Sequence, residues 1–565
     1  MKFRYTLAIL STAALNAPLA SGAEAEAAIG VYLTRGNQSK LLSAESDLSF
    51  VSGPGSNATK INFDTAGTYQ TMSGFGAAMT DSSAWLIQNE LNPTQRDALM
   101  QQLFSPTDGI GISYLRVPMG ASDFALSPYT YNDLPNGQTD PGQTNFSIAH
   151  DQAYIIPILQ QAKALNPQLG MMATPWSAPA WMKNNNSLVN GSLQSQYYAS
   201  YADYFVKFFN AYEAQGLTFD TLTVQNEPQN ATNHPSMTMS TFQQSTFIGD
   251  HLGPALVSAG IDTKIVAFDH NWDNWNYPVI VMNDPEAGQY TTGAAFHAYA
   301  GTVDQQSNFH DFFPDKDIYF TEITGGDWAT NFSDNLVWNM RNIVIGSTRN
   351  WAKTALFWNI ALDENNGPYL PGGCSTCRGV VTIDTNTGGI DYSEEYYSIA
   401  HASKFVQPGA VRIETDSISD VIETVGFLNP DGSRVLIALN PSNFSRRFDV
   451  VEGEESFSYQ LSAKSVATFV WPGEVPLEGD LDGDGFVGIA DLNLVLGAWN
   501  QNVPPGNALA DPSGDGFVGI EDLNIVLGNW NAGTPPATYA DIPEPGAAVV
   551  LGVGAVIIGL RRRRY

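Results

Sequence analysis

Short apolar runs alternate with longer helix-like stretches through most of the chain. The runs are rich in β-branched and aliphatic residues and each ends in polar or aromatic residues; they span residues 111–117, 170–174, 221–224, 264–268, 318–321 and 355–359. Strands that alternate with helices indicate an α/β fold built from parallel β/α units. We therefore predict a (β/α)8 TIM barrel over residues 69–402, with its chemistry at the C-terminal ends of the strands.

The spans on either side of this region have a different pattern. Residues 28–68 and 403–473 contain short alternating strand-like segments separated by Gly, Asn and Pro turns. Alternation of this kind is typical of strands with one buried face. We predict that the two spans join in one attached β-sandwich domain.

A duplicated segment follows from residue 479, as DLDGDGFVGIADLNLVLGAWN and DPSGDGFVGIEDLNIVLGNWN. Each copy has an oxygen-rich loop with a glycine at its turning position and then an apolar helix-like stretch. Calcium takes about six to eight oxygen ligands around such a turn, so we predict structural Ca2+ in residues 479–532. The predicted ligands are Asp480, Asp482, Asp484, the Phe486 carbonyl and Asp491 in the first loop, and Asp511, Ser513, Asp515, the Phe517 carbonyl and Asp522 in the second.

The last ligand of each loop is Asp, whereas an EF-hand has Glu there, and only one short helix follows each loop. In both respects the pair resembles a type I dockerin, a small α module that folds around calcium and docks onto cohesin domains. The resemblance implies a cohesin-type protein partner. A solvated acidic linker is the alternative, but the apolar face of each helix needs a surface to pack against.

The N-terminal segment has the features of a secretory signal peptide. Lys2 and Arg4 precede an apolar run over residues 7–19, and small residues follow at 20–23. This order predicts a signal peptide over residues 1–23 and an exported protein, extracellular or at the cell surface. A buried first strand is the alternative.

The C-terminal segment combines a Pro-Glu-Pro motif at 543–545, an apolar stretch over 547–560 and four arginines at 561–564. The stretch is short for a spanning helix, which needs about 17 to 25 residues. Residues 541–565 resemble the bacterial PEP-CTERM sorting signal. The resemblance implies transient membrane contact and processing by a membrane protease, with an ordinary tail anchor as the alternative.

Charge and cysteine content narrow the function. The formal net charge of −31, from 57 acidic and 26 basic residues, argues against a nucleic-acid partner and favours a neutral substrate.

The two cysteines, Cys374 and Cys377, lie in a loop rich in Gly and Pro. A zinc site needs four ligands, so a local disulfide is the favoured prediction in an exported protein, and free thiols remain open.

Two glutamates end separate strand-like segments, Glu227 in TLTVQNEP and Glu322 in DIYFTEIT. The interval between them is about three β/α repeats of roughly 30 residues each, which places them on strands four and seven, across the barrel mouth. Retaining glycoside hydrolysis needs two carboxyl groups about 5 Å apart. We predict Glu227 as general acid/base and Glu322 as nucleophile, with no cofactor for catalysis.

The barrel and sandwich together resemble glycoside hydrolase family 30, which includes glucosylceramidase. The resemblance rests on eight segments in family order: SGFGAAMTDSSAW (73–85), SYLRVPMGASDF (113–124), ATPWSAPAWMK (173–183), TVQNEP (223–228), AFHAYAG (295–301), YFTEITGGDW (319–328), LFWNIALDENNGP (356–368) and YYSIAHASKFVQPGAVRI (396–413). It implies that Glu227 and Glu322 are catalytic. It also implies that a nonreducing-end sugar is bound by Asp81, Trp176, Asn226 and Trp358, in a pocket also lined by Arg116, His297 and Tyr299.

Several alternatives remain open. Arg116 can instead hold a catalytic glutamate in place, and His297 can be a buried core histidine. The implied substrate is a β-glucoside or β-glucan, either glucosylceramide-like or β-1,6-linked. β-Xylanase or β-fucosidase activity on the same scaffold is the alternative, and from another class a non-catalytic carbohydrate-binding protein attached to the dockerin-like module.

Overall fold

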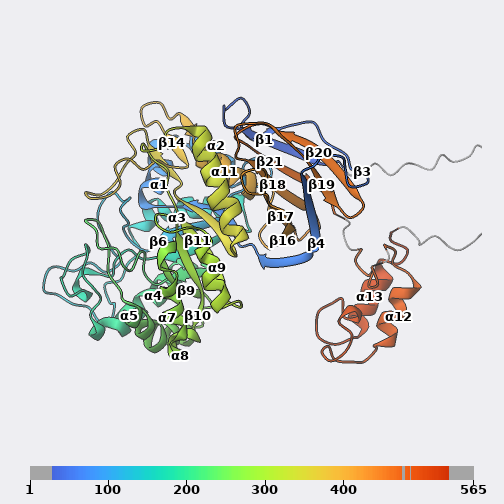
Figure 1. Ribbon diagram of the computed structural model, residues 1–565. Coiled ribbons are helices and arrows are strands. Elements are labelled where there is room, and N and C mark those ends of the chain that lie inside the picture. The colour runs from blue at the N-terminus through green and yellow to red at the C-terminus, as the bar shows by residue number, and fades with distance from the viewer. Residues whose placement is uncertain (1–27, 474–476, 484, 534–565) are drawn as a thin grey trace, which may run out of the picture. The chain divides into compact units, whose positions relative to one another are not determined.

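The computed structural model describes residues 28–473, 477–483 and 485–533, which fall into two compact units that divide after Gly473 (Figure 1). The predicted signal peptide at 1–23 and the predicted sorting segment at 541–565 lie outside the described residues. The predicted calcium ligand Asp484 also lies outside them.

Eight parallel strands close into a barrel in the first unit, which confirms the predicted (β/α)8 fold. Each strand pairs with the next in the chain and the last pairs with the first. The strands are β5 (Gly74–Ala78), β6 (Tyr114–Pro118), β7 (Gly170–Thr174), β8 (Thr221–Thr223), β9 (Lys264–Asn271), β10 (Thr291–His297), β11 (Asp317–Glu322) and β12 (Ala352–Asn359). A layer of side chains from six of these strands fills the interior, namely Tyr114, Met172, Val266, Ala295, Tyr319 and Leu356.

Helices follow the barrel strands along the chain. They are α1 (Asp81–Trp85), α2 (Pro93–Phe104), α3 (Ile155–Leu165), α4 (Tyr198–Glu213), α5 (Thr241–Phe247), α6 (Gly253–Ala259), α7 (Asn276–Asn283), α8 (Pro285–Gly288), α9 (Gln305–Phe312), α10 (Phe332–Trp338) and α11 (Glu394–Ser403). Local sequence fixes where some begin: α2 starts at a capping box of Asn92 and Gln95 with Pro93 in its first turn. Among the described residues, no helix has both the length and the apolar character that a membrane span requires.

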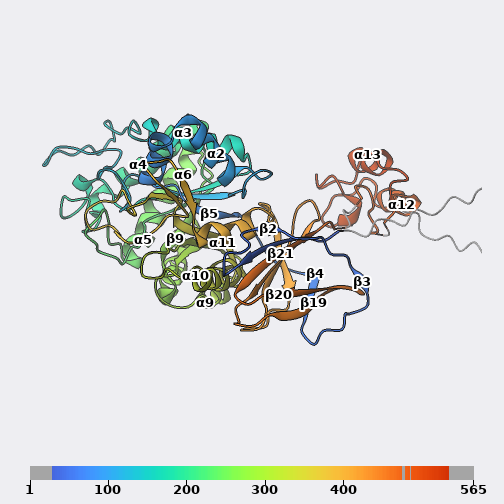
Figure 2. The ribbon, with the colours of Figure 1, turned by 90° about the horizontal axis from the view of Figure 1, so that it is seen from above.

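Both flanks of the barrel contribute to one β-sandwich, as predicted. The N-terminal flank supplies β1 (Gly30–Arg35), β2 (Ser43–Ala44), β3 (Val51–Ser52) and β4 (Lys60–Thr71), and the C-terminal flank supplies β16 (Val411–Thr415), β17 (Glu423–Leu428), β18 (Arg434–Asn440), β19 (Arg446–Glu452), β20 (Glu455–Leu461) and β21 (Ser465–Trp471). Strand β1 pairs with β21, and β4 pairs with both β16 and β19. These strands lie together beside the barrel (Figure 2).

One buried histidine joins the barrel to the sandwich. His401, on α11, contacts the hydroxyl oxygens of Thr34 on β1 and Thr468 on β21, both at 2.8 Å from its ring nitrogens. Burial lowers the pKa of His401 to about 3, so the ring is neutral at ordinary pH. The contact therefore depends on an uncharged imidazole.

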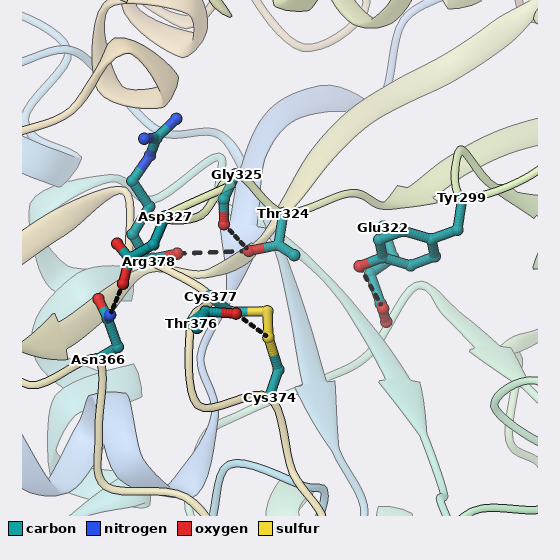
Figure 3. The surroundings of a disulfide bond; sticks show 10 residues. All are labelled: Tyr299, Glu322, Thr324, Gly325, Asp327, Asn366, Cys374, Thr376, Cys377 and Arg378. Atoms are coloured by element: carbon teal, nitrogen blue, oxygen red, sulfur yellow. Dashed lines mark hydrogen bonds between the residues drawn. A yellow bond between two sulfur atoms is a disulfide. The ribbon is translucent and has the colours of Figure 1, made fainter. Parts of the chain in front are cut away.

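A small sheet lies between the last barrel strand and α11. It consists of β13 (Ala361–Asp363), β14 (Val381–Ile383) and β15 (Ile390–Tyr392). The connection from β13 to β14 contains a disulfide between Cys374 and Cys377 (Figure 3), which confirms the predicted pairing.

The second unit contains two short helices, α12 (Ile489–Gly497) and α13 (Ile520–Gly528), one after each repeated loop. Six apolar residues from the two copies form one shared core: Val487, Val495, Ala498, Ala510, Val518 and Val526. The glycines at the turning positions, Gly485 and Gly516, have φ of 81° and 84°. A residue with a Cβ is strained in that region, which explains why both loops have glycine there.

Candidate active site

A cavity of about 520 Å3 opens at the C-terminal ends of the barrel strands. Its walls bring together six of the nine predicted site residues: Trp176, Asn226, Glu227, Tyr299, Glu322 and Trp358. Active sites of (β/α)8 enzymes are built at this end of the barrel. The cavity is therefore the candidate active site.

The two glutamates lie across the cavity from each other. Glu227 follows β8, the fourth barrel strand, and Glu322 is the last residue of β11, the seventh. A carboxylate oxygen of each lies within 4.8 Å of the other and of a ring nitrogen of His297. Retaining glycosidases place their two carboxyl groups about 5 to 5.5 Å apart, so the spacing suits double displacement.

The backbone around Glu227 is strained. Glu227 has a φ of 44°, and Phe268 and Asp269 at the end of β9 have φ of 77° and 69°. The amide N–H of Glu227 donates to the carbonyl oxygen of Asp269 at 2.9 Å, which links the two strained segments. Non-glycine residues hold such conformations only where their surroundings impose them, and this occurs most often at functional sites.

Two donors hold the carboxylate of Glu322. The Arg116 guanidinium donates to its Oε2 at 2.5 Å, and the Tyr299 hydroxyl donates to its Oε1 at 2.9 Å. Arg116 is fully buried beneath the cavity and also donates to Asn226 at 2.7 Å and to Asp269 at 2.8 Å. Arg116 thus positions Glu322 and Asn226 together, the structural role that was left open for it.

His297 lies between carboxylates on both sides. Its Nδ1 is 3.1 Å from Glu227 and its Nε2 is 3.0 Å from Asp269. Burial would lower the pKa of His297, but the charges of Glu322 and Asp269 and the hydrogen bonds to Asp269 and Glu227 outweigh it and raise the pKa to about 9. At neutral pH the imidazolium therefore donates to both neighbours.

The same contact sets the ionisation of Glu227. Burial alone would raise its pKa, but the hydrogen bond and the charge of His297 lower the pKa to about 2. In the free enzyme the proton of this pair therefore resides on His297, 3.1 Å from the oxygen of Glu227. Glu227 and His297 therefore share one proton and titrate together, and they do not behave as two independent acids.

Asp269 is a functional residue that the sequence did not reveal. It accepts hydrogen bonds from Arg116, from His297 and, at 2.7 Å, from the hydroxyls of Thr223 and Thr321. Burial opposes its charge, but Arg116 and His297 lower its pKa below the usual range. The available signal was its place directly after the apolar run of β9.

Two aspartates near the cavity differ from the sequence prediction. Asp123 was not predicted as a site residue, and Asp81 was predicted to bind the sugar but is engaged elsewhere. Asp123 lines the cavity, and burial together with the charge of Glu322 raises its pKa to about 8. Asp81 does not line the cavity. Its carboxylate instead accepts from the Leu126 amide at 2.8 Å and the Tyr154 hydroxyl at 2.7 Å, and contacts His150 at 2.8 Å.

Two tryptophans form the closed end of the cavity. Trp176 and Trp358 stack with ring centroids 5.0 Å apart, and each is almost fully buried. The Arg116 guanidinium lies 4.8 Å from the Trp176 ring. Their aromatic surfaces suit the C–H face of a sugar ring.

Carboxylate and imidazole atoms of Glu227, His297 and Glu322 lie close enough together to hold a metal ion. In this arrangement Arg116 already supplies a positive charge to Glu322, and both nitrogens of His297 have carboxylate partners. The cluster is thus equipped for proton transfer between its own groups.

Comparison with known proteins identifies both parts of the first unit. The Glycosyl hydrolase family 30 TIM-barrel domain matches residues 72–406, and the Glycosyl hydrolase family 30 beta sandwich domain matches residues 409–469. The endo-1,6-beta-D-glucanase BGN16.3 of Trichoderma harzianum is 34% identical over 84% of this chain and 100% of its own. The lysosomal acid glucosylceramidase of Mus musculus is 31% identical over 71% of this chain and 81% of its own.

A solved structure supports the same assignment. The endo-β1,6-glucanase BT3312 superposes with a TM-score of 0.74 at 36% identity, covering 79% of this chain and 99% of its own. The fold, the paired glutamates and these matches agree. The chain therefore belongs to glycosyl hydrolase family 30 and is a glycosidase that hydrolyses O-glycosyl compounds.

Proposed function

We propose that the protein is a retaining β-glycosidase that cleaves β-glucosidic bonds by double displacement, with Glu322 as nucleophile and Glu227 as general acid/base. One observation carries the proposal: the two carboxylates lie within 4.8 Å, one held by Arg116 and Tyr299 and the other beside the proton of His297. Glu322 is thus positioned to attack the anomeric carbon, and Glu227 can relay the proton of His297 to the leaving oxygen.

In the first step an oxygen of Glu322 attacks the anomeric carbon, and the bond to the leaving oxygen breaks. The proton passes from His297 to Glu227 and from Glu227 to the leaving oxygen, so the leaving group departs as a neutral alcohol. Ester formation removes the negative charge of Glu322. That charge helps to stabilise the His297 imidazolium, so its loss favours release of the proton.

In the second step a water molecule replaces the leaving group. Glu227, now a carboxylate, accepts a proton from the water while the oxygen attacks the anomeric carbon and Glu322 is released. Arg116 and Tyr299 receive the returning negative charge on Glu322 through the same two hydrogen bonds. The anomeric configuration is retained.

For the substrate we propose a β-1,6-linked glucan. Support comes from three relatives named endo-1,6-β-D-glucanase, which are 34–36% identical over 74–84% of this chain, and from the endo-β1,6-glucanase structure. Relatives named glucosylceramidase make a glucosylceramide-like β-glucoside the second candidate. The test is product analysis by NMR on β-1,6-glucan, glucosylceramide and glucuronoxylan. Release of xylo-oligosaccharides alone would contradict a glucosidic specificity.

We also propose that residues 479–532 form a dockerin-like module that binds structural Ca2+. Support comes from the first loop, where carboxylate oxygens of Asp480, Asp482 and Asp491 lie within 4.8 Å of one another. In the second loop Asp522 accepts backbone N–H groups from Ser513 and Gly519 at 3.1 and 2.6 Å, which turns its carboxylate toward the loop. All of these proposed ligand atoms are carboxylate oxygens, and calcium prefers oxygen ligands. A rise in the melting temperature of this unit with added calcium is the test.

We further propose that the protein is exported and acts outside the cell or at its surface. The signal-like residues 1–23 and the sorting-like residues 541–565 support this. On this proposal the C-terminal segment makes transient membrane contact, and a cohesin-type protein is a partner of the dockerin-like module. Fractionation of the native host and N-terminal sequencing of the mature protein test export. Pull-down with a cohesin domain tests the partner.

A further inference from the structure

A second cavity, of about 490 Å3, adjoins the active-site cavity. The two share three wall residues, Tyr299, Thr324 and Trp328. Beyond them the second cavity extends along α10 to Trp338, with Arg378 and Glu395 also in its wall. We call this second cavity the Trp328–Trp338 groove. It continues the active-site cavity across the surface of the barrel.

Trp328 is a fixed aromatic platform at the junction of the two cavities. A Cβ on Gly326 would lie only 2.1 Å from Cζ3 and 2.4 Å from Cη2 of the Trp328 indole, so the ring rests directly on this glycine. The residue is nevertheless 60% exposed. One part of the indole is therefore held against the backbone while the rest faces the cavities.

The disulfide loop, which Figure 3 shows together with Gly325 and Asp327, is bonded to the segment that leads to Trp328. Gly326 pairs with Cys377 in an isolated β-bridge, the Asp327 amide donates to the Thr376 carbonyl at 2.9 Å, and the Arg378 amide donates to the Gly325 carbonyl at 3.0 Å. These bonds connect the segment after Glu322 to the loop that lines the active-site cavity. The position of Trp328 is thus set by the same loop that forms part of the catalytic wall.

The far end of the groove has a second exposed aromatic residue and polar groups around it. Trp338, at the end of α10, is 40% exposed. The side chain of Asp334 is 66% exposed, and its ion pair with Lys464 is long, at 3.5 Å. Arg378 pairs with Glu395 at 2.9 Å in the groove wall. Aromatic surface interrupted by a few hydrogen-bonding groups is the chemistry that recognises sugars.

The groove lies on the open side of the active site. Trp176 and Trp358 are buried at the closed end, and neither lines the groove. The sugar that is attacked therefore fits beside these two tryptophans, and the groove offers the rest of the chain a path past Tyr299 and Trp328. A lipid chain in the groove would remove water from the Asp334 carboxylate, whose side chain is 66% exposed, and this is unfavourable for a charged group.

We propose that the Trp328–Trp338 groove binds the leaving-group side of a β-glucan chain, with glucosyl residues beyond the cleaved bond stacked on Trp328 and Trp338. The inference rests on the proposed function for its substrate class. In this proposal Trp338 determines specificity: it favours longer chains by contacting their distal glucosyl residues, and it takes no part in bond cleavage.

The test compares Trp338→Ala with wild type on an aryl β-glucoside and on linear β-1,6-gluco-oligosaccharides of increasing length. Trp338→Phe retains an aromatic face, and Phe444→Ala removes an exposed aromatic side chain from the loop between β18 and β19 as a control. For Trp338→Ala we expect kcat/KM on long oligosaccharides to fall about three- to tenfold through KM, the range that one aromatic contact is worth. We expect aryl β-glucoside turnover to be unchanged and Trp338→Phe to recover most of the loss.

A binding measurement separates this inference from the proposed function. In a Glu322→Gln background, calorimetry with a long β-1,6-gluco-oligosaccharide measures the Kd without turnover, and adding Trp338→Ala should raise the Kd by the same factor. An unchanged Kd and an unchanged dependence of kcat/KM on chain length would overturn the groove while leaving the catalytic glutamates intact. Loss confined to glucosylceramide in vesicles would make a lipid the occupant and also overturn it. Binding that depends on Trp338 without any wild-type cleavage would contradict the proposed function alone.

Discussion

Replacing His297 with Asn removes the group that stores the catalytic proton. In wild type, the pair of His297 and Glu227 holds one proton up to a pH near the His297 pKa of about 9. We therefore expect the alkaline limb of the kcat/KM profile at about pH 9. In His297→Asn the proton must reside on Glu227 itself.

The shift follows from the contacts of Glu227. Its pKa of about 2 results from the hydrogen bond and charge of His297 acting against burial. Without His297 the effect of burial remains, so the pKa of Glu227 rises, while His270 and the hydrogen bond from Asn230 still lower it, and we expect it to stay below 9. The alkaline limb therefore moves to lower pH, and each pH unit between the new limb and the assay pH costs about tenfold in kcat/KM. A limb two pH units below the assay pH corresponds to a loss of about a hundredfold.

The assay is the pH dependence of kcat/KM on an aryl β-glucoside from pH 4 to about 10, with the limbs fitted separately. His310→Asn is the matched control, because His310 stacks on Trp351 and does not line the active-site cavity. Its alkaline limb should coincide with that of wild type. An alkaline limb that stays near pH 9 in His297→Asn would refute the idea that His297 holds the proton.

Three further predictions follow from the structure. Glu227→Gln should lower kcat/KM by about 10²- to 10⁴-fold on substrates with sugar leaving groups and much less on nitrophenyl glucosides, with azide restoring turnover; equal losses on both would contradict an acid/base role. Chelation should lower the melting temperature of residues 479–532, followed by calorimetry, while aryl-glucoside turnover persists; immediate loss of activity would contradict separate roles for the two units. Because the pKa of His401 falls from 6.5 in the unfolded chain to about 3 on folding, the folded protein should lose about 1.4 kcal/mol per pH unit as the pH falls from 6.5 toward 3, and His401→Gln should lack this slope in urea titrations.

Much of the barrel could be predicted because its strands are buried on both faces and read as continuous apolar runs. The first strand, β5, gave no such signal, since Gly74–Ala78 is GFGAA. The structure explains its composition: a Cβ on Gly76 would lie 2.1 Å from the carbonyl oxygen of Tyr114 on β6. Close contact between β5 and β6 therefore selects glycine over the β-branched residues by which strands are recognised.

The paired glutamates were predictable for a similar reason. Each follows an apolar strand, and the interval between them fixes their places in the barrel. The choice between Asp81 and Asp123 was not predictable, since both carboxylates follow barrel strands. It depends on the long connection between β6 and α3, whose His150 and Tyr154 engage Asp81 and leave Asp123 to line the cavity.

The proton shared by Glu227 and His297 also could not be derived from sequence. It depends on two distances of about 3 Å between side chains on three different strand ends, and on Asp269, which has no motif of its own. Residue types can suggest a glutamate pair. Only the positions of the charges determine where the proton resides.

The central claim is that Glu322 forms a covalent bond to the sugar. The most direct test is to incubate the enzyme with an activated 2-deoxy-2-fluoro-β-glucoside, which slows release of the intermediate, and to map the labelled peptide by mass spectrometry. The account predicts one added fluoroglucosyl group on Glu322 and none in Glu322→Gln. A label on Glu227 or Asp123, or turnover of the reagent with inversion and no label, would contradict it.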